Sequence, residues 1–410
     1  MKTIAIGLSP NTETSDVLLA IKRICTPWSY KKGSATSLLE QWFRYYFHVS
    51  SAISFSSGRG ALFAILHSLG IKNGDEVVLQ AFTCVAVVEP ILATGAKPLY
   101  VDIGYDLTLD VKKVESAITK KTKAIIAQHT FGIPAHMEKL RELAKKYNLF
   151  LIEDAAHVIG ATYQNKKIGT FGIASIFSFG RDKAFSSVFG GMAITNDKKL
   201  GDALRVFQRK KETPGYFWIF QQLLHPIAFF FILPLYNIFS VGKALLVLLQ
   251  RLHLLSFPVT KEEKNGVLPN IYIQKLPNAL SALSYFQIRK VERYNKKREK
   301  IVQLYQDVCK KLGIQTVERA TGPLLRFPIF VENPSQMKKF FKKRSIYLGN
   351  WYEHIIDPLG VDLTKIYYRR GQCLVAEECA RKIVNLPTYP TIKEEDVIRV
   401  IDTLQAYVRG

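Results

Sequence analysis

Two short apolar runs, each followed by a charged residue, most constrain what this chain can fold into. Residues 149–152 lead into Asp154, and residues 174–179 lead through a glycine into Lys183. Both runs have the length and composition of strands buried on two faces, which are typical of parallel sheets covered by helices. We therefore expect one acid and one lysine just past the carboxyl ends of strands, where functional groups of such sheets collect.

Further strand and helix patterns extend this sheet along the chain. Strand patterns at 75–79, 99–102 and 124–128 alternate with helical patterns at 61–69, 110–120 and 136–147. This alternation predicts an α/β fold with a mostly parallel sheet and right-handed crossovers. A long basic helix over 285–312, a strand over 326–331 and a helix over 393–408 predict a smaller C-terminal α+β domain.

The domain organisation follows from these patterns and from changes in composition. We expect an N-terminal basic and aromatic segment over 1–50, a large domain over 51–215, a hydrophobic insert over 216–260 and a small domain over 261–410.

The groups at the predicted strand ends suit pyridoxal phosphate chemistry. That cofactor needs an amine to hold its aldehyde as a Schiff base, a carboxylate to keep its pyridine nitrogen protonated, and donors for its phosphate. Lys183, Asp154 and Ser178 supply these three kinds of group. Spacing alone also fits a solvated lysine and an ordinary acid at a strand end, so the order and identity of the neighbouring residues must decide between these interpretations.

The sequence of these two segments resembles that of the DegT/StrS family of pyridoxal phosphate-dependent sugar aminotransferases. The family's acidic segment reads Glu153-Asp154-Ala155-Ala156-His157 here, and its lysine segment reads Ser178-Phe179-Gly180-Arg181-Asp182-Lys183. The resemblance implies a fold-type I transferase in which Lys183 forms the Schiff base, Asp154 holds the pyridinium and His157 lies by the ring. It implies an L-glutamate donor, a keto-sugar acceptor carried on a nucleotide, and a homodimer.

A turn before the first long helix resembles the family's phosphate site. Ser57, Gly58 and Arg59 open a helical pattern, and a helix N-terminus offers free backbone N–H groups to an anion. The resemblance implies that Gly58, Arg59 and Ser178 bind the cofactor phosphate. Cys84 occupies the position where many members place an aromatic residue against the ring. His129, at another strand end, is a candidate only for a supporting role.

Three positions differ from the family pattern and keep other functions open. Phe189 replaces an acid after the lysine, Ile273 replaces an asparagine that reaches the partner's cofactor phosphate, and Cys84 replaces the stacking aromatic. The alternatives are a non-catalytic, membrane-associated binding protein that retained the fold, or another pyridoxal phosphate reaction on a sugar.

The charge balance limits the partners. With 57 Lys and Arg against 34 Asp and Glu, the formal charge is +23, which suits nucleic acid, an anionic membrane face or polyanionic substrates. No nucleic-acid-binding signature is present, so we expect no nucleic-acid partner. The five cysteines are scattered without a C-x-x-C pair, so we expect neither disulfides nor a metal site, and a cytoplasmic location.

The hydrophobic insert is unusual for a sheet protein of this kind. Residues 215–242 contain no Asp, Glu, Lys or Arg, and we expect Pro226 and Pro234 to break the run into pieces too short to cross a membrane. Three interpretations remain open: a monotopic patch at the inner face of the cell membrane, a soluble insert packed in a dimer interface, and a short two-crossing hairpin.

The N-terminal segment raises a similar question. Aromatic residues between 28 and 47 alternate with lysines and arginines, a pattern that suits lipid head groups, a dimer interface or the edge of a core. The family resemblance implies an aminotransferase that works on a keto-sugar, and the membrane-like insert adds the hypothesis of a nucleotide- or lipid-linked acceptor in cell-envelope glycan synthesis.

Overall fold

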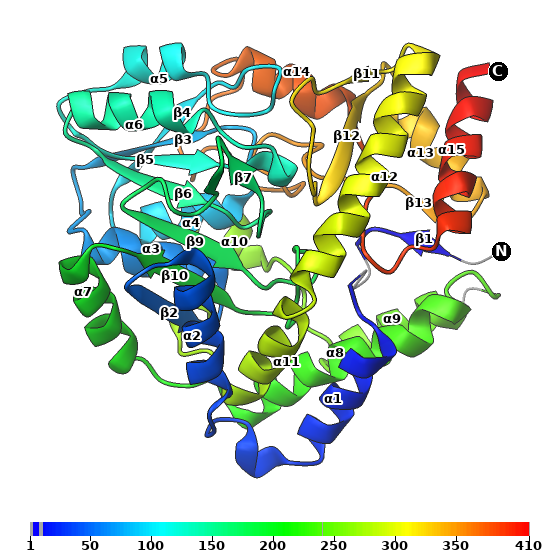
Figure 1. The fold of residues 1–410 in the computed structure, drawn as a ribbon, viewed down its shortest axis with the longest axis horizontal. Coiled ribbons are helices and arrows are strands. Elements are labelled where there is room, and N and C mark those ends of the chain that lie inside the picture. The colour runs from blue at the N-terminus through cyan, green and yellow to red at the C-terminus, as the bar shows by residue number, and fades with distance from the viewer. Residues whose placement is uncertain (1–2, 8–10, 240, 410) are drawn as a thin grey trace.

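A seven-stranded sheet forms the centre of the computed structural model, which describes residues 3–7, 11–239 and 241–409 (Figure 1). The order is β2–β10–β9–β6–β5–β3–β4, and every pair is parallel except the two that involve β10. The strands are β2 (Ser51–Phe55), β3 (Glu76–Gln80), β4 (Lys97–Val101), β5 (Thr122–Gln128), β6 (Phe150–Asp154), β9 (Ala174–Ser178) and β10 (Gly191–Thr195). The mixed, mostly parallel sheet expected from the sequence is confirmed.

Helices cover both faces of this sheet because its strands are apolar on both sides. Side chains such as Val77 and Ile126 pack with α3 and α4, whereas Val78 and Ile125 pack with α5 and α6. The helices are α3 (Gly58–Ser68), α4 (Val85–Ala93), α5 (Val111–Ala117), α6 (Met137–Lys146) and α7 (Lys198–Arg209). This double cover leaves the carboxyl ends of the strands as the edge where polar side chains gather.

A smaller α+β unit follows the central sheet. Its three-stranded antiparallel sheet has the order β11 (Gln315–Thr316), β12 (Arg326–Phe330) and β14 (Ile383–Pro387). Four helices surround it: α12 (Val291–Leu312), α13 (Pro334–Lys343), α14 (Leu374–Lys382) and α15 (Glu394–Arg409). The structure also has two short strand pairings, β1 (Ile4–Ala5) with β13 (Ile346–Tyr347) and β7 (Thr162–Tyr163) with β8 (Lys166–Lys167), and a 3-10 turn, η2 (Thr130–Gly132).

The expected single helix over 285–312 is wrong, because the chain turns within it. The structure has α11 (Asn278–Ile288) and then α12, separated at Arg289 and Lys290. Lys290 contacts Glu13 and Asp16 at the start of α1 (Thr14–Ile24). Its position at the break thus ties the N-terminal segment to the junction between α11 and α12.

The N-terminal segment is split between core and surface. In α2 (Ala35–Phe47), Phe43 is fully buried and packs on Phe177 of β9 and on Phe179 just after that strand, on the way to the candidate lysine. In contrast, Trp28 of η1 (Pro27–Ser29) is 72% exposed and Tyr45 is 81% exposed. The core-edge interpretation therefore holds for one face of α2 only.

The hydrophobic insert folds as two helices beside α1. The first, α8 (Tyr216–Leu235), is continuous through Pro226 and Pro234, so the expected break at the prolines is wrong. One side of α8 packs on α1 and α11, and α9 (Val241–Arg251) packs on it in turn. This packing offsets the cost of about 3 kcal/mol that a proline imposes inside a helix. Short turns α10 (Lys261–Lys264) and η3 (Asn270–Ile273) then lead back to the domain.

Candidate active site

The polar residues predicted at the strand ends come together at one edge of the sheet. Asp154 ends β6 and Ser178 ends the adjacent parallel strand β9, with Asp154 opposite Ile176 in register. The loop after β9 carries Lys183, and its conformation brings the lysine back toward Ser178 across Gly180. The register of two neighbouring strands therefore places an acid, a hydroxyl and an amine around one space.

Asp154 fits the nitrogen of a pyridine ring. Its Oδ1 accepts a hydrogen bond of 3.0 Å from the backbone N–H of Ala156, while Oδ2 accepts none within the described part of the chain. Burial raises the pKa of this carboxyl, and the positive charge of Lys183 opposes that rise. A protonated ring nitrogen at Oδ2 would satisfy the free oxygen and keep the carboxylate ionised.

The amine of Lys183 is free to react. Its Nζ lies 4.6 Å from the centre of the Trp351 ring, and no carboxylate of the described residues lies within ion-pair distance. Burial lowers the pKa of the amine to about 8, and the negative charge of Asp154 opposes that lowering. A sizeable share of the amine is therefore unprotonated near neutral pH, as a nucleophile requires.

The loop that carries Lys183 is fixed by residues far away in sequence. Asn11 donates a side-chain hydrogen bond to the carbonyl of Lys183, and the buried Arg298 of α12 donates one of 2.8 Å to the carbonyl of Ala184. These contacts hold the lysine backbone while its side chain stays free.

We expect covalent loading of the cofactor to follow the lowered pKa of Lys183. The rate at which the cofactor-free protein takes up pyridoxal phosphate, trapped by borohydride, should rise with pH, reach half of its maximum near pH 8 and then level off. At pH 7 this pKa leaves roughly 300 times more free amine than an ordinary lysine has. A rise that continues to the ordinary lysine value of 10.5 would contradict the effect of burial on this amine.

The turn before α3 forms an anion cradle. Ser57 caps the helix, since its Oγ accepts from the N–H of Gly60 at 3.0 Å, and the backbone N–H groups of Gly58 and Arg59 remain free among the described hydrogen bonds. A Cβ on Gly58 would lie 2.9 Å from the Cβ of Ser178, so only glycine allows this approach. The Ser178 hydroxyl thus lies beside the N-terminus of an eleven-residue helix, as a phosphate needs.

The Arg59 guanidinium is directed at two acids. It forms ion pairs with the fully buried Glu263 and, at 3.7 Å, with Glu89, and it lies 4.5 Å from the ring centre of Tyr272. Burial raises the pKa of Glu89 to about 8, with Arg59 opposing the rise. The role of Arg59 at the phosphate therefore rests on its backbone N–H, and the side-chain contact stays a prediction.

His157 lies over the site as a neutral ring. Its Nδ1 accepts from the backbone N–H of Phe131 at 3.1 Å, so its Nε2 carries the proton and donates to the Tyr352 hydroxyl at 3.1 Å. Burial holds the pKa of His157 well below its usual value. The ring also stacks on Trp351 with centres 5.2 Å apart, which places it beside Lys183.

Cys84 lies near the site without the area of an aromatic ring. It precedes α4, and its backbone pairs with Asp357. Burial raises the pKa of its thiol to about 11, so the thiol is neutral at ordinary pH. Phe82, two residues earlier, is buried between Phe131 and Tyr352 with edge-to-face contacts.

Two residues at the site escaped the sequence analysis: Arg326 and Trp351. Arg326 begins β12 but is only 2% exposed, and its guanidinium lies 3.7 Å from the ring centre of Trp351. Its ion pair with Asp182 is long, at 4.0 Å, and its Nε has no hydrogen-bond partner. The only sequence feature that could have predicted this buried charge is an arginine as the first residue of an apolar strand.

The positions that differ from the family pattern have other contacts. Phe189 stacks on Tyr272 with ring centres 5.6 Å apart and contacts Trp218 of α8 at 5.5 Å. The segment around Ile273 packs against its own chain, because Ser57 donates to the carbonyl of Tyr272 at 2.9 Å. His129, the candidate for a supporting role, contacts the buried Glu153 through its Nε2 at 3.3 Å.

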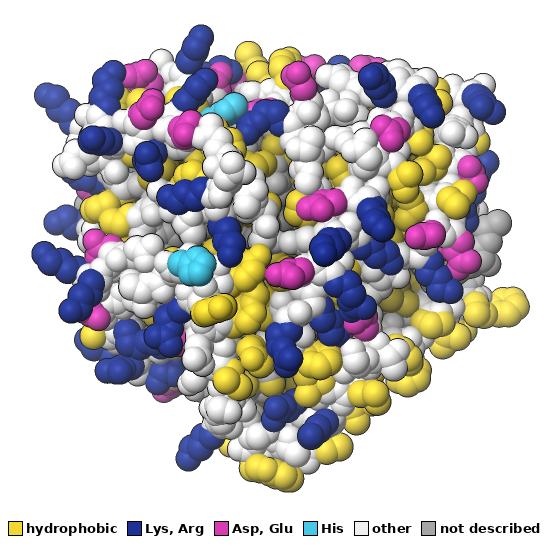
Figure 2. Space-filling view, viewed as in Figure 1, with side chains coloured by type: hydrophobic (Ala, Val, Ile, Leu, Met, Phe, Trp, Pro, Cys, Tyr) yellow, Lys and Arg dark blue, Asp and Glu magenta, His cyan; other side chains and the backbone are white. Residues whose placement is uncertain are grey.

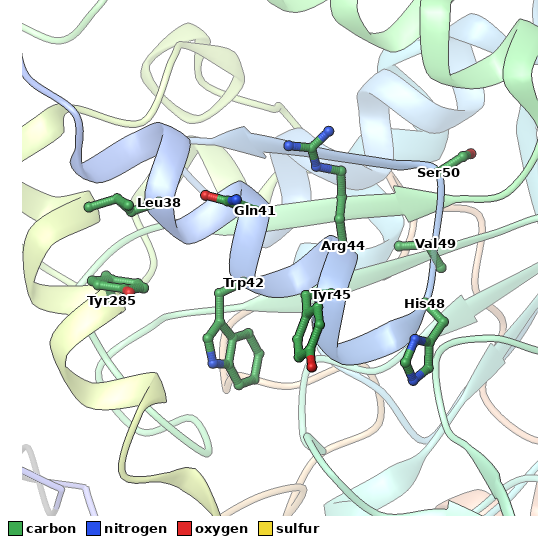
Figure 3. Close-up of a pocket in the computed structure, with 9 residues that line it drawn as sticks. All are labelled: Leu38, Gln41, Trp42, Arg44, Tyr45, His48, Val49, Ser50 and Tyr285. Atoms are coloured by element: carbon green, nitrogen blue, oxygen red, sulfur yellow. The ribbon is translucent and has the colours of Figure 1, made fainter.

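Open grooves elsewhere do not contain these residues. One groove, with a volume of about 690 Å³, runs along α2. Figure 3 shows the residues that line it, Trp42, Arg44, Tyr45, His48 and Tyr285 among them. A second, of about 640 Å³, lies between the start of α1, Phe230 and α12. Within the described ranges, no group of three or more His, Cys, Asp or Glu residues is placed to hold a metal ion.

Comparison with known proteins gives a consistent match. The model of the DegT/DnrJ/EryC1/StrS aminotransferase family matches residues 12–215 and 254–405. The GDP-perosamine synthase of Escherichia coli O157:H7 is 43% identical over 176 residues, which span 43% of this chain and only 48% of that protein. The GDP-perosamine synthase of Vibrio cholerae is 25% identical over 401 residues, 93% of this chain and 92% of that protein.

Solved structures agree in fold. DesV of S. venezuelae in complex with a ketimine intermediate superposes with a TM-score of 0.75 and 25% identity, covering 97% of this chain and 95% of that one. Helicobacter pylori PseC, an aminotransferase of pseudoaminic acid biosynthesis, gives 0.77 at 20% identity over the full length of both chains.

Proposed function

Because this chain belongs to the DegT/DnrJ/EryC1/StrS aminotransferase family, and is therefore a pyridoxal phosphate-dependent sugar aminotransferase, we propose L-glutamate as its amino donor and a nucleotide-linked keto-sugar as its acceptor. The observation that carries this proposal is the free Lys183 amine beside the free Oδ2 of Asp154 and the anion cradle at Gly58 and Ser178. The family assignment argues against the non-catalytic alternative.

The residues of the site have separable roles. Bound pyridoxal phosphate would supply an acceptor for the electron pair of the C–H bond that breaks beside the transferred nitrogen. Lys183 would then hold the proton at Nζ and return it, a role for which a pKa of about 8 suits neutral pH. Asp154 would keep the ring nitrogen protonated, and the N–H groups at the start of α3 together with Ser178 would hold the phosphate.

Arg326 is the candidate to bind the donor. Its guanidinium is buried, positively charged and only weakly paired with Asp182, and it shares the Trp351 ring with Lys183. A carboxylate of L-glutamate would satisfy the Nε–H that has no partner. This contact would fix the donor's amino group near the lysine.

The acceptor follows from charge and from the relatives. A formal net charge of +23 suits an acceptor that carries a diphosphate. The relatives named GDP-perosamine synthases favour a GDP-linked keto-sugar over a lipid-linked one. The aminated sugar would be a precursor for a cell-envelope glycan.

The test measures both halves of the reaction. Protein loaded with pyridoxal phosphate should release 2-oxoglutarate from L-glutamate with a change in its visible absorption, and should then aminate GDP-linked keto-sugars, identified by mass. TDP-linked keto-sugars serve as the comparison. Release of 2-oxoglutarate without amination of any nucleotide-linked sugar would contradict the proposed acceptor, and no release would contradict the proposed donor.

A further inference from the structure

The insert exposes an unusual amount of hydrophobic surface. Of the 27 large hydrophobic side chains described as exposed, 12 belong to residues 216–257, about a tenth of the chain. The most prominent are Phe217, Phe231, Ile238, Phe239, Leu248 and Leu252, with Phe239 at 96% exposure. We name the exposed hydrophobic side chains of residues 216–257 the α8–α9 face. Soluble monomers rarely expose so many hydrophobic residues along one segment without a partner.

The α8–α9 face is continuous with exposed hydrophobic residues of the N-terminal segment. Helix α1 packs along α8, and Leu18 and Ile21 of α1 are 62% and 42% exposed. Figure 2 shows hydrophobic side chains along the edge of the molecule formed by α8, α9 and α1, with Lys and Arg side chains beside it. Most of the insert lies between the two segments that the family model matches, so the family's sequence pattern does not describe it.

Helix α8 is apolar on both sides, which sets it apart from an ordinary surface helix. Its buried side includes Leu223 and Ile232, both fully buried, and its outer side carries Phe217, Phe231 and Leu235. Its 20 residues and mean hydropathy of 1.5 are sufficient for a membrane span by length and composition. The structure does not favour that arrangement, because the inner side is already occupied by protein.

Contacts with the active-site loop hold α8 in place. Trp218 packs against Phe189, and Gln222 accepts a hydrogen bond of 2.8 Å from Ser256, whose Oγ in turn accepts from Arg181. A helix that left the domain to cross a bilayer would lose these contacts beside Lys183. The α8–α9 face can therefore meet lipid only with its helices lying along the membrane surface.

The charges around the face favour anionic lipid. The sequence from 213 to 260 contains no Asp or Glu. Lys31 lies 4.9 Å from the ring centre of the exposed Tyr216, and Lys243 lies 5.4 Å from that of the half-buried Tyr236, so both lysines lie beside aromatic residues of the insert. Lys22 and Lys32 are exposed nearby on the N-terminal segment. Basic residues next to aromatic and aliphatic ones match the interface of an anionic bilayer.

We propose that the α8–α9 face docks in plane on an anionic lipid bilayer, with α1 and its lysines at the edge of the contact. A second copy of this chain is the alternative occupant. It is disfavoured because two copies of one face would bring like charges, Lys31 and Lys243 among them, toward each other without an acid in the segment to pair them.

Vesicle sedimentation tests the proposal on the full-length, cofactor-loaded protein. We expect it to bind vesicles of phosphatidylcholine with phosphatidylglycerol, to bind phosphatidylcholine alone weakly, and to lose binding as salt increases. Phe231→Ser/Phe239→Ser/Leu248→Ser should lower partition by about 100-fold, since each buried hydrophobic side chain contributes severalfold or more. Lys22→Gln/Lys32→Gln should lower it by roughly fivefold per lysine.

Matched controls separate docking from folding and from catalysis. Leu359→Ser/Leu374→Ser/Ile398→Ser changes three residues that are 58–69% exposed elsewhere and should leave vesicle binding unchanged. The reaction with L-glutamate should be unchanged in both triple variants. Absence of vesicle binding by the natural sequence would overturn the proposal. So would a dimer that the Phe231→Ser/Phe239→Ser/Leu248→Ser variant converts to monomers, because a second copy would then cover the face.

Discussion

Lys183→Ala is expected to reduce amino transfer from L-glutamate by at least about 10⁴-fold, the largest effect of any single change in this chain. The substitution removes both the amine that holds the cofactor and the base that moves the proton. Arg326, which shares the Trp351 ring with Lys183, cannot replace it, because burial lowers the pKa of its guanidinium only to about 10 and the group stays protonated at neutral pH. Release of 2-oxoglutarate, followed by coupled absorbance, measures the loss.

A second measurement distinguishes lost chemistry from lost folding. The exposed Lys199 on α7 provides the control, since Lys199→Ala removes an equal side chain and should retain full activity. The Lys183→Ala variant should keep its thermal unfolding midpoint or raise it slightly, because the lost amine was buried without an acid partner. Small primary amines added to the buffer should restore part of the activity. Transfer at the natural rate in Lys183→Ala would contradict the assignment.

The sequence was sufficient to predict the half of the site that depends on local pattern. Asp154 and Ser178 lie at the ends of apolar strands, and a glycine turn opening a helix predicted the position of Gly58. Each of these features depends on a few consecutive residues and on the rule that parallel strands end at one edge. The family resemblance added the role of each residue, which spacing alone did not provide.

The other half of the site depends on distant packing and was not predictable from pattern. Arg326 and Trp351 reach Lys183 from the C-terminal unit, and Asn11 and Arg298 fix its loop, all through contacts between residues far apart in sequence. Buried arginines are rare, so composition gives no reason to expect one at the start of a strand.

The wrong expectations share a physical cause. Proline lowers helix propensity, yet α8 continues through two prolines because α1, α9 and α11 pack along it. The helix expected over 285–312 breaks where Lys290 reaches the acids that begin α1. In both cases tertiary contacts outweighed a local preference of a few kcal/mol. Such contacts join residues far apart in the chain, so no short stretch of the sequence reveals them.

Arg326→Met is expected to raise the KM for L-glutamate by roughly 100-fold or more, with a smaller effect on the KM for the keto-sugar. A buried, charge-assisted hydrogen bond to a carboxylate contributes about 3 kcal/mol or more when one partner is removed. Methionine keeps an unbranched side chain of similar length over the Trp351 ring, so the packing is largely retained. Steady-state kinetics with each substrate varied in turn measure the two KM values separately.

Asp182 affects the result of Arg326→Met, because it pairs with Arg326. Lost stability must therefore be separated from lost affinity for glutamate. Burial raises the pKa of Asp182, with Arg326 opposing the rise, so loss of the guanidinium leaves an acid without its nearest cation. Arg326→Met/Asp182→Asn removes that cost and should regain stability without regaining glutamate affinity. Arg326→Lys keeps the charge without the planar fork and should restore only part of the affinity. A rise confined to the keto-sugar KM would instead assign Arg326 to the acceptor diphosphate, because a guanidinium binds phosphate as readily as carboxylate.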